Sequence, residues 1–195
     1  MSQESWNTWE KINGNDTLLY DFPLNKDGVV YDIGGHKGDW AESVSNLYDC
    51  NIYIYEPVDA FYQALCRRFK PFPKVRVSNR AAYWCRSKQI IGVNGSSSGF
   101  FDNSPGEEVD CVDIVEEIGP EKIDLMKINI EGAEYNVLWR LLQADKIKDI
   151  TNILIQFHDN VPDHSVIRQS IRLRLALTHQ LIFDFPDVWE CWRVK

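Results

Sequence analysis

Short apolar runs alternate along the chain with segments whose apolar residues recur at helical spacing. The run 29–33 is rich in β-branched residues and is followed by two glycines, which is typical of a buried strand. Residues 40–47 then place apolar side chains about every 3.6 positions, as the buried face of a helix does. This pattern predicts strands over 29–33, 52–55, 75–77, 123–130, 150–157, 180–185 and 188–194, and helices over 40–47, 58–69 and 137–142.

Two segments are less regular. In residues 1–27, Trp6, Trp9 and Ile12 stand at helical spacing, so we expect a short helix that packs on the rest of the protein. Residues 81–111 hold short β-like pieces between glycines, and we expect an irregular or hairpin insertion there.

Residues 165–177 fit two structures. Alternate apolar positions from Ile171 onward are typical of a strand, whereas a wider spacing fits a helix. One face of that helix would carry Val166, Ser170, Leu173 and Leu177.

The alternation of strands and helices predicts an α/β fold. We expect a doubly wound, mostly parallel, seven-stranded sheet with a reversed C-terminal hairpin strand, because Pro186-Asp187 is too short to connect parallel strands. We expect an N-terminal helical extension over 1–27 and a single domain over 28–195. Ligands of such sheets bind beyond the carboxyl ends of the strands.

Composition narrows the function. The 195 residues suit one domain, and the net charge of −8 disfavours a general nucleic-acid binder. No apolar run approaches the roughly 18 residues that span a bilayer, and the polar start lacks the pattern of a secretory signal. The five cysteines form no CxxC pair, so neither a zinc site nor a disulfide framework is indicated. We expect a reduced, cytoplasmic protein, and the sequence leaves its oligomeric state open.

The turn after the first predicted strand carries the first candidate site. It reads D-x-G-x-x-x-G from Asp32 to Gly38, and His36 and Asp39 exclude the dinucleotide pattern G-x-G-x-x-G. A carboxylate beside this turn repels a pyrophosphate and suits a zwitterion or cation, such as the methionine part of S-adenosylmethionine. The alternative is that Asp32 only caps the next helix and the glycines only form a turn.

Glu56 ends the second predicted strand. An acid about 20 residues after such a glycine turn can accept hydrogen bonds from ribose hydroxyls. The alternative is an exposed acid that is favoured there by the dipole of the following helix. The glycine turn and the acid together indicate a nucleoside site more strongly than either does alone.

Four motifs in this order resemble those of FkbM-type methyltransferases, which are class I S-adenosylmethionine enzymes. Residues 30–38 resemble the family's D-V-G-A-N-x-G, with Gly35 in place of Ala and His36 in place of Asn. The other matches are Tyr55-Glu56-Pro57 with its E-P, Asn79-Arg80-Ala81 with its N-x-A, and residues 127–134 with its K-x-D-x-E-G-x-E. Asn129 stands where the last motif usually has Asp.

The resemblance implies a Rossmann-like class I methyltransferase fold and methyl transfer to oxygen, often on a sugar or natural-product hydroxyl. We therefore predict an O-methyltransferase that acts on a small hydroxylated or carbohydrate acceptor with S-adenosylmethionine as cofactor. The residues expected to bind the cofactor are Asp32, Gly34, Gly35, His36, Gly38, Glu56, Asn79 and Ala81, with Asn79 near the adenine.

Two residues are candidates for the reaction itself. His158 follows the fifth predicted strand, and its reference pKa of ~6.5 suits a base that removes a hydroxyl proton. Glu131 could orient the acceptor or contact the cofactor amine. His158 could equally satisfy loop hydrogen bonds, and the glycine after Glu131 could mark a simple turn.

The pair Asp159-Asn160 raises a metal as a further possibility. With Glu131 or Asn129 it would give an oxygen-rich site suited to Mg²⁺. Asp-Asn is also common in turns, so we favour the turn and assign no metal ligands.

Residues 67–88 are basic, unlike the chain as a whole, and include interleaved aromatic residues. Such a stretch could receive phosphorylated sugars or single-stranded nucleic acid, so a nucleic-acid methyltransferase is an alternative function. We favour an ordinary solvated surface. A non-catalytic cofactor-binding protein is a third reading, because Asn129 departs from the family motif.

Overall fold

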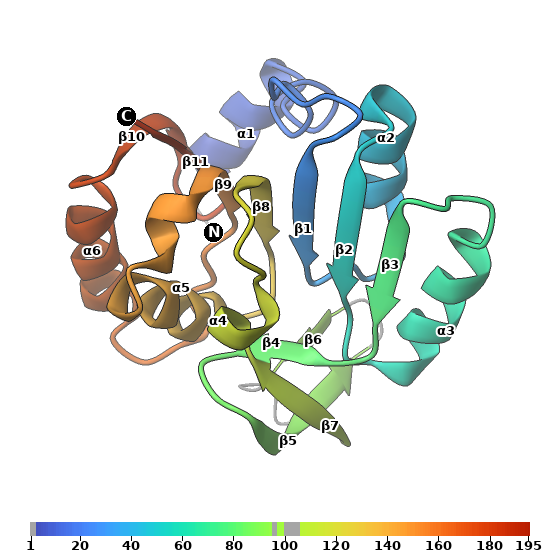
Figure 1. The fold of residues 1–195 in the computed structure, drawn as a ribbon. Coiled ribbons are helices and arrows are strands. Elements are labelled where there is room, and N and C mark those ends of the chain that lie inside the picture. The colour runs from blue at the N-terminus through green and yellow to red at the C-terminus, as the bar shows by residue number, and fades with distance from the viewer. Residues whose placement is uncertain (1–2, 95–96, 100–105) are drawn as a thin grey trace.

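The computed structural model describes residues 3–94, 97–99 and 106–195. The strands of its main sheet are β1 (Val29–Ile33), β2 (Asn51–Tyr55), β3 (Val75–Ser78), β8 (Ile123–Ile128), β9 (Ile150–Ile155), β10 (His179–Phe185) and β11 (Trp189–Val194). They are arranged in the order β10-β11-β9-β8-β1-β2-β3 (Figure 1). The five strands from β9 to β3 are parallel, whereas β11 is antiparallel to both β9 and β10. The predicted seven-stranded sheet and its reversed hairpin are confirmed.

Helices cover both faces of this sheet. They are α1 (Gln3–Lys11), α2 (Asp39–Tyr48), α3 (Asp59–Arg68), α4 (Ile114–Glu117), α5 (Glu134–Gln143) and α6 (His164–Leu175), with a 3-10 turn η1 (Lys146–Asp149). Apolar residues of α2 and α3 pack with Val30, Ile52 and Ile54 on one face. Those of α5 and α6 pack with Ile33 and Met126 on the other. This double cover explains why the central strands read as continuous apolar runs.

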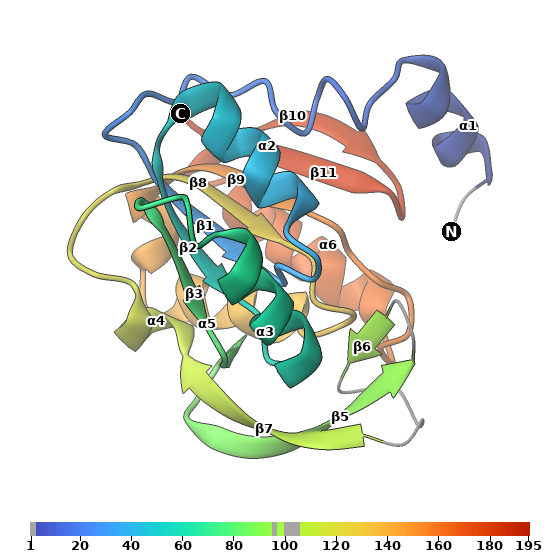
Figure 2. The ribbon, with the colours of Figure 1, turned by 90° about the vertical axis from the view of Figure 1, so that its right-hand side faces the viewer.

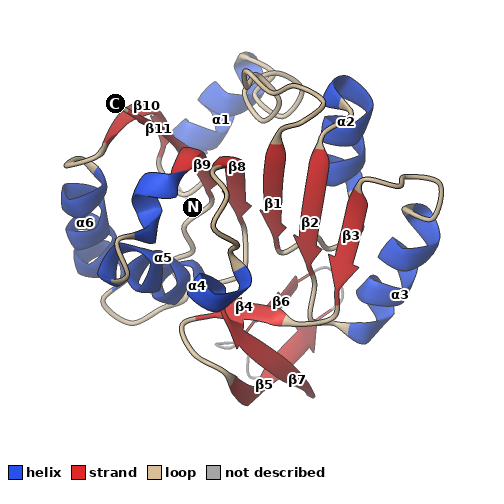
Figure 3. Cartoon of the chain, viewed as in Figure 1, coloured by secondary structure: helices blue, strands red, loops and turns tan. Residues whose placement is uncertain are grey.

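The insertion between β3 and β8 forms a second, four-stranded sheet, which sequence patterning did not resolve. Its strands are β4 (Ala81–Tyr83), β5 (Ser87–Asn94), β6 (Ser97–Gly99) and β7 (Gly106–Asp113), in the order β4-β7-β5-β6. The predicted hairpin is present as β5 and β6, and β4 pairs in parallel with β7. This sheet lies beyond the carboxyl ends of β1, β2 and β8, where ligands of α/β sheets bind (Figures 1 and 3).

The predicted N-terminal helix packs against the C-terminal hairpin (Figure 2). Trp9 of α1 is fully buried, and its ring lies 5.1 Å from that of Phe185 and 6.1 Å from that of Phe183. Ile12, which the spacing placed on the same face, is exposed, because the helix ends at Lys11. The division of the chain at residue 28 stays a prediction.

The ambiguous segment after residue 164 is the helix α6, but its buried face is not the predicted one. Ile171 and Leu175 are fully buried, whereas Leu173 and Leu177 are 67% and 78% exposed. Apolar residues occur on both sides of this helix, so periodicity alone could not select the inner side.

Among the described residues, no helix combines the length and apolar character that crossing a bilayer requires.

The contact between α1 and the hairpin gives a first prediction. Trp9→Ala removes a fully buried indole and should lower the free energy of unfolding by about 3 kcal/mol, measured by urea denaturation. Trp84→Ala is the matched control, because Trp84 is half exposed, and its effect should stay within about 0.5 kcal/mol. Equal effects of the two substitutions would show that α1 does not stabilise the protein.

Candidate active site

The turn between β1 and α2 requires glycine at two positions. Gly34 has φ +88°, and a Cβ there would lie 2.0 Å from the carbonyl oxygen of Asn129. Gly38, at the N-cap of α2, has φ +87°, and its Cβ would lie 2.7 Å from Leu65 Cδ2. Both the backbone conformation and the space therefore exclude a side chain. The turn lies directly against the end of β8.

Asp32, at the end of β1, is fully buried and pairs with Lys127 of β8. The Lys127 ammonium lies 2.7 Å from Asp32 Oδ1 and donates a second hydrogen bond to the Gly34 carbonyl at 2.9 Å. Asp32 Oδ2 has no hydrogen-bond partner, so Asp32 does not cap α2, the role considered for it from the sequence. Burial raises the pKa of Asp32 above its ordinary value, and the Lys127 charge opposes this shift.

Glu56 is almost completely buried at the end of β2. Its Oε2 accepts a hydrogen bond from the His36 backbone N–H at 2.8 Å, and its Oε1 accepts one from Val58 N–H at 3.0 Å. Burial raises the pKa of this carboxyl, and the two backbone donors oppose the shift. The carboxylate thus fixes the loops after β1 and β2 together, and each oxygen keeps acceptor capacity for a ligand.

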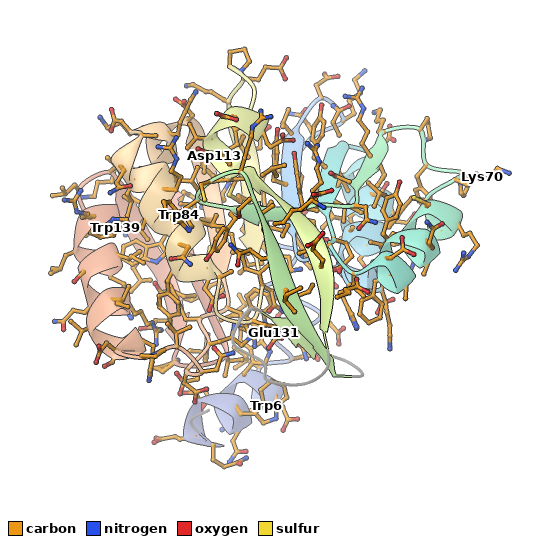
Figure 4. All side chains as sticks on the ribbon, turned by 90° about the horizontal axis from the view of Figure 1, so that it is seen from below. Trp6, Lys70, Trp84, Asp113, Glu131 and Trp139 are labelled. Atoms are coloured by element: carbon orange, nitrogen blue, oxygen red, sulfur yellow. The ribbon has the colours of Figure 1, made fainter. Side chains whose placement is uncertain are left out.

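A cavity lies where these two loops, the end of β8 and the small sheet meet. Its lining includes four of the predicted residues, namely Gly34, His36, Glu56 and Ala81. Glu131 and Asn129, at the end of β8, also line it. The small sheet contributes Ala82, Ile91 and Gly99, and a Cβ at Gly99 would lie 2.8 Å from Glu131 Cβ. Seen from this end, Glu131 lies behind the small sheet (Figure 4).

Two buried polar atoms of the lining residues have no hydrogen-bond partner. They are Nε2 of His36 and Oδ1 of Asn129. The His36 ring is held edge-on against Phe61 at 4.4 Å, and burial lowers the pKa of His36 below its ordinary value. Because unsatisfied buried polar atoms are uncommon in proteins, these two indicate that the cavity takes a polar ligand.

The other predicted cofactor residues lie outside the lining. Asp32 and Gly38 lie behind it and shape the turn, and a Cβ at Gly35 would lie 2.2 Å from Ile54 Cγ2. The amide nitrogen of Asn79 donates to Asp59 Oδ1 at 3.2 Å. Ala81, two residues further, does line the cavity.

The two predicted reaction residues are neighbours. His158 Nε2 lies 3.5 Å from Glu131 Oε1. Burial acts to lower the pKa of His158, but the hydrogen bond and charge of Glu134, with the charges of Glu131 and Asp159, outweigh it and raise the pKa above its ordinary value. The pair provides a proton acceptor beside the cavity.

The described residues contain no group of three His, Cys, Asp or Glu side chains placed to hold a metal ion. Asn160, considered as a ligand, instead donates its amide N–H to the Glu131 carbonyl at 3.1 Å. This contact joins the loop after β9 to the turn after β8.

Most cations of the basic stretch 67–88 are paired with acids. The pairs are Arg68 with Asp39 and Glu42, Lys74 with Asp49, Arg80 with Glu117, Arg86 with Glu116, and Lys88 with Glu108 and Asp110. Of its interleaved aromatic residues, Phe69 is buried and Trp84 is half exposed. Lys70 projects away from the body of the protein (Figure 4). This pairing offsets much of the local positive charge.

The strand order, the reversed hairpin and the cavity at the carboxyl ends define a Rossmann-like class I methyltransferase fold. The sequence pattern of the methyltransferase FkbM domain matches residues 32–178, so the chain belongs to this family. A comparison with curated protein sequences gave no match.

Solved structures show the same fold at low sequence identity. An FkbM methyltransferase from Methylobacillus flagellatus KT is 14% identical with a TM-score of 0.62, and the match covers 90% of this chain and 45% of that one. This chain therefore spans less than half the length of that relative. A putative rRNA methylase from Clostridium thermocellum is 7% identical with a TM-score of 0.60 and 94% of both chains covered. A putative tRNA methyltransferase from Streptococcus pneumoniae is 11% identical with a TM-score of 0.51, covering 91% of this chain and 68% of that one.

Several site residues were not found from the sequence. The sequence identified Lys127 only as part of a motif. In the structure its side chain, on β8, forms an ion pair with Asp32 on the neighbouring strand β1. Ile91 and Gly99 come from the small sheet, whose strands the sequence pattern did not define. Glu134, which accepts a hydrogen bond from His158, was also missed. Its place as the last acid of the motif 127–134 was the available signal.

The buried pair of Asp32 and Lys127 gives a second prediction. Lys127→Met leaves a buried carboxylate without its partner, and the free energy of unfolding at pH 7 should fall by about 3 kcal/mol in urea denaturation. The double variant with Asp32→Asn should recover part of the loss, because no buried charge remains.

Lys148→Met is the control for this pair. Lys148 and Asp145 form an exposed ion pair, so its loss should cost less than about 1 kcal/mol. Similar losses at the buried and exposed lysines would contradict a special role for Lys127.

Proposed function

We propose that this protein is an S-adenosylmethionine-dependent methyltransferase that methylates a hydroxyl group of a small or carbohydrate acceptor. The observation that supports it best is the cavity at the carboxyl ends of β1 and β2, with a glycine turn and a buried acid on its wall. The unpartnered atoms of His36 and Asn129 supply polar contacts that a nucleoside with an amino-acid tail could use.

The residues present fit such a cofactor. Glu56 has acceptor capacity for ribose hydroxyls, and Gly34 leaves the backbone open to a close approach. Pro57, Ala81 and Ile91 form apolar wall suited to an adenine ring. The bound cofactor would supply an electrophilic methyl group on a sulfonium.

The acceptor would then bind beside Glu131. Removing a hydroxyl proton requires a base close to the attacking oxygen, and His158 lies next to Glu131. The charged groups around His158 are Glu131, Glu134 and Asp159, so the acceptor end is acidic. An acidic surrounding favours neutral hydroxylated acceptors over phosphate-bearing ones.

A nucleic-acid acceptor is the second candidate. Its support is that two structural neighbours are described as putative rRNA and tRNA methylases, although the likeness is one of fold. The paired cations of residues 67–88 and the net charge of −8 favour the small acceptor. A non-catalytic protein is disfavoured because His158 and Glu131 lie together.

Cofactor binding can be tested without knowing the acceptor. The protein should bind S-adenosylhomocysteine with micromolar Kd in isothermal titration calorimetry. Glu56→Gln should weaken binding by ~1–3 kcal/mol, roughly 5- to 150-fold in Kd, because the charged acceptor for the ribose is lost. Glu10→Gln on the exposed side of α1 is the control and should leave Kd unchanged. No measurable binding to the unmodified protein would overturn the proposal.

The choice of acceptor class gives a separate test. Single-stranded RNA and DNA should show no gel retardation at low salt, since the cations of 67–88 are largely paired. A salt-sensitive shift that Arg67→Ala with Lys70→Ala abolishes would instead favour the nucleic-acid reading, because both side chains are exposed.

A further inference from the structure

Glu134, the first residue of α5, is a fully buried carboxylate that the sequence motif did not assign to any role. Its Oε1 accepts a hydrogen bond from His158 backbone N–H at 2.7 Å and lies 3.1 Å from His158 Nδ1. Its Oε2 accepts one from Gly132 N–H at 2.9 Å. One buried side chain therefore contacts the end of β9 and the turn after β8.

The turn that Glu134 holds is strained. Glu131 has φ +52° and Gly132 has φ +107°, and only glycine adopts such values without cost. The hydrogen bond from Gly132 to Glu134 supports this conformation and directs Glu131 to the cavity. Both oxygens of this buried carboxyl accept hydrogen bonds, so its burial leaves neither of them unsatisfied.

The contact with Nδ1 also decides where the His158 proton lies. A carboxylate can only accept, so neutral His158 must carry its proton on Nδ1 and leave Nε2 bare. Nε2 then lies 3.5 Å from Glu131 Oε1. Both atoms are hydrogen-bond acceptors, and there is no proton between them. A hydroxyl group entering beside them would supply that proton.

We propose that Glu134 is a positioning residue that holds His158 as the Nδ1–H tautomer, so that its free Nε2 takes the proton of the acceptor hydroxyl. This rests on the proposed methyltransferase function. The acceptor oxygen forms a bond to the methyl carbon, the electron pair of the broken C–S bond stays on sulfur, and the hydroxyl proton moves to Nε2. The imidazolium formed lies between Glu131 and Glu134, with Asp159 nearby, and these three acids stabilise its charge. His158 is partly exposed, which allows the proton to pass to water afterwards.

The tautomer can be read directly by long-range ¹H–¹⁵N correlation spectra of the four histidine rings, recorded with a chelator present. His158→Gln assigns the His158 signals. At a pH where His158 is neutral, the unmodified protein should show a protonated Nδ1 and an unprotonated Nε2. Glu134→Leu removes the acceptor from Nδ1, so it should abolish this preference and lower the pH at which the ring titrates. Glu131→Gln, the matched control on the other nitrogen, should keep the Nδ1–H tautomer.

An Nε2–H tautomer in the unmodified protein would overturn the proposal, and so would an unchanged tautomer in Glu134→Leu. The first measurement needs no variant of Glu134, so it decides even where that variant fails to fold. Calorimetry with S-adenosylhomocysteine is run in parallel. If the proposed function is wrong, the protein does not bind S-adenosylhomocysteine. If only the positioning role is wrong, binding is present and the histidine spectra show a different tautomer.

Discussion

The ammonium of Lys127 joins the ends of the two central strands of this protein. It binds the Asp32 carboxylate and the Gly34 carbonyl from the neighbouring strand β8, in a place that water scarcely reaches. Asn129, the residue directly after β8, donates its backbone N–H to the Ile33 carbonyl and lies against Gly34. The position of the glycine turn, and with it the floor of the cavity, depends on this contact.

Buried carboxylates extend the same arrangement to the rest of the site. Asp32 connects β1 with β8, Glu56 connects the loops after β1 and β2, and Glu134 connects the turn after β8 with the end of β9. Each accepts hydrogen bonds from groups of a neighbouring strand or loop. A buried acid bonded in this way fixes geometry, because moving it would break those bonds in a place where water cannot replace them.

The small sheet covers the cavity beside Glu131. The small sheet places Ile91 and Gly99 over the cavity, and Gly99 has no side chain where it meets Glu131. Such a cover reduces the volume open to water, and electrostatic interactions are stronger where water is excluded. Glu131, His158 and Glu134 lie beside one another there, as the proposed removal of a hydroxyl proton requires.

The main sheet was predictable from sequence because its strands are local apolar runs with clear stops. The glycine turn and Glu56 were also readable, since each directly follows such a run. The inner side of α6 was not, because Leu173 and Ile171 are equally apolar and only packing against the sheet distinguishes them. The small sheet was missed because β4 pairs with β7, and β5 and β6 lie between these two strands in the sequence.

The sequence by itself determined the order of the elements, the conformation of the turns at glycine, and the family motifs, all of which depend on residues near one another in the chain. Only the tertiary structure decided that Asp32 pairs with Lys127, that the basic stretch is largely paired with acids, and that Glu134 reaches His158. These contacts join residues from different strands and helices. Their distances are set by the packing of the sheet and its helices, which no local pattern encodes.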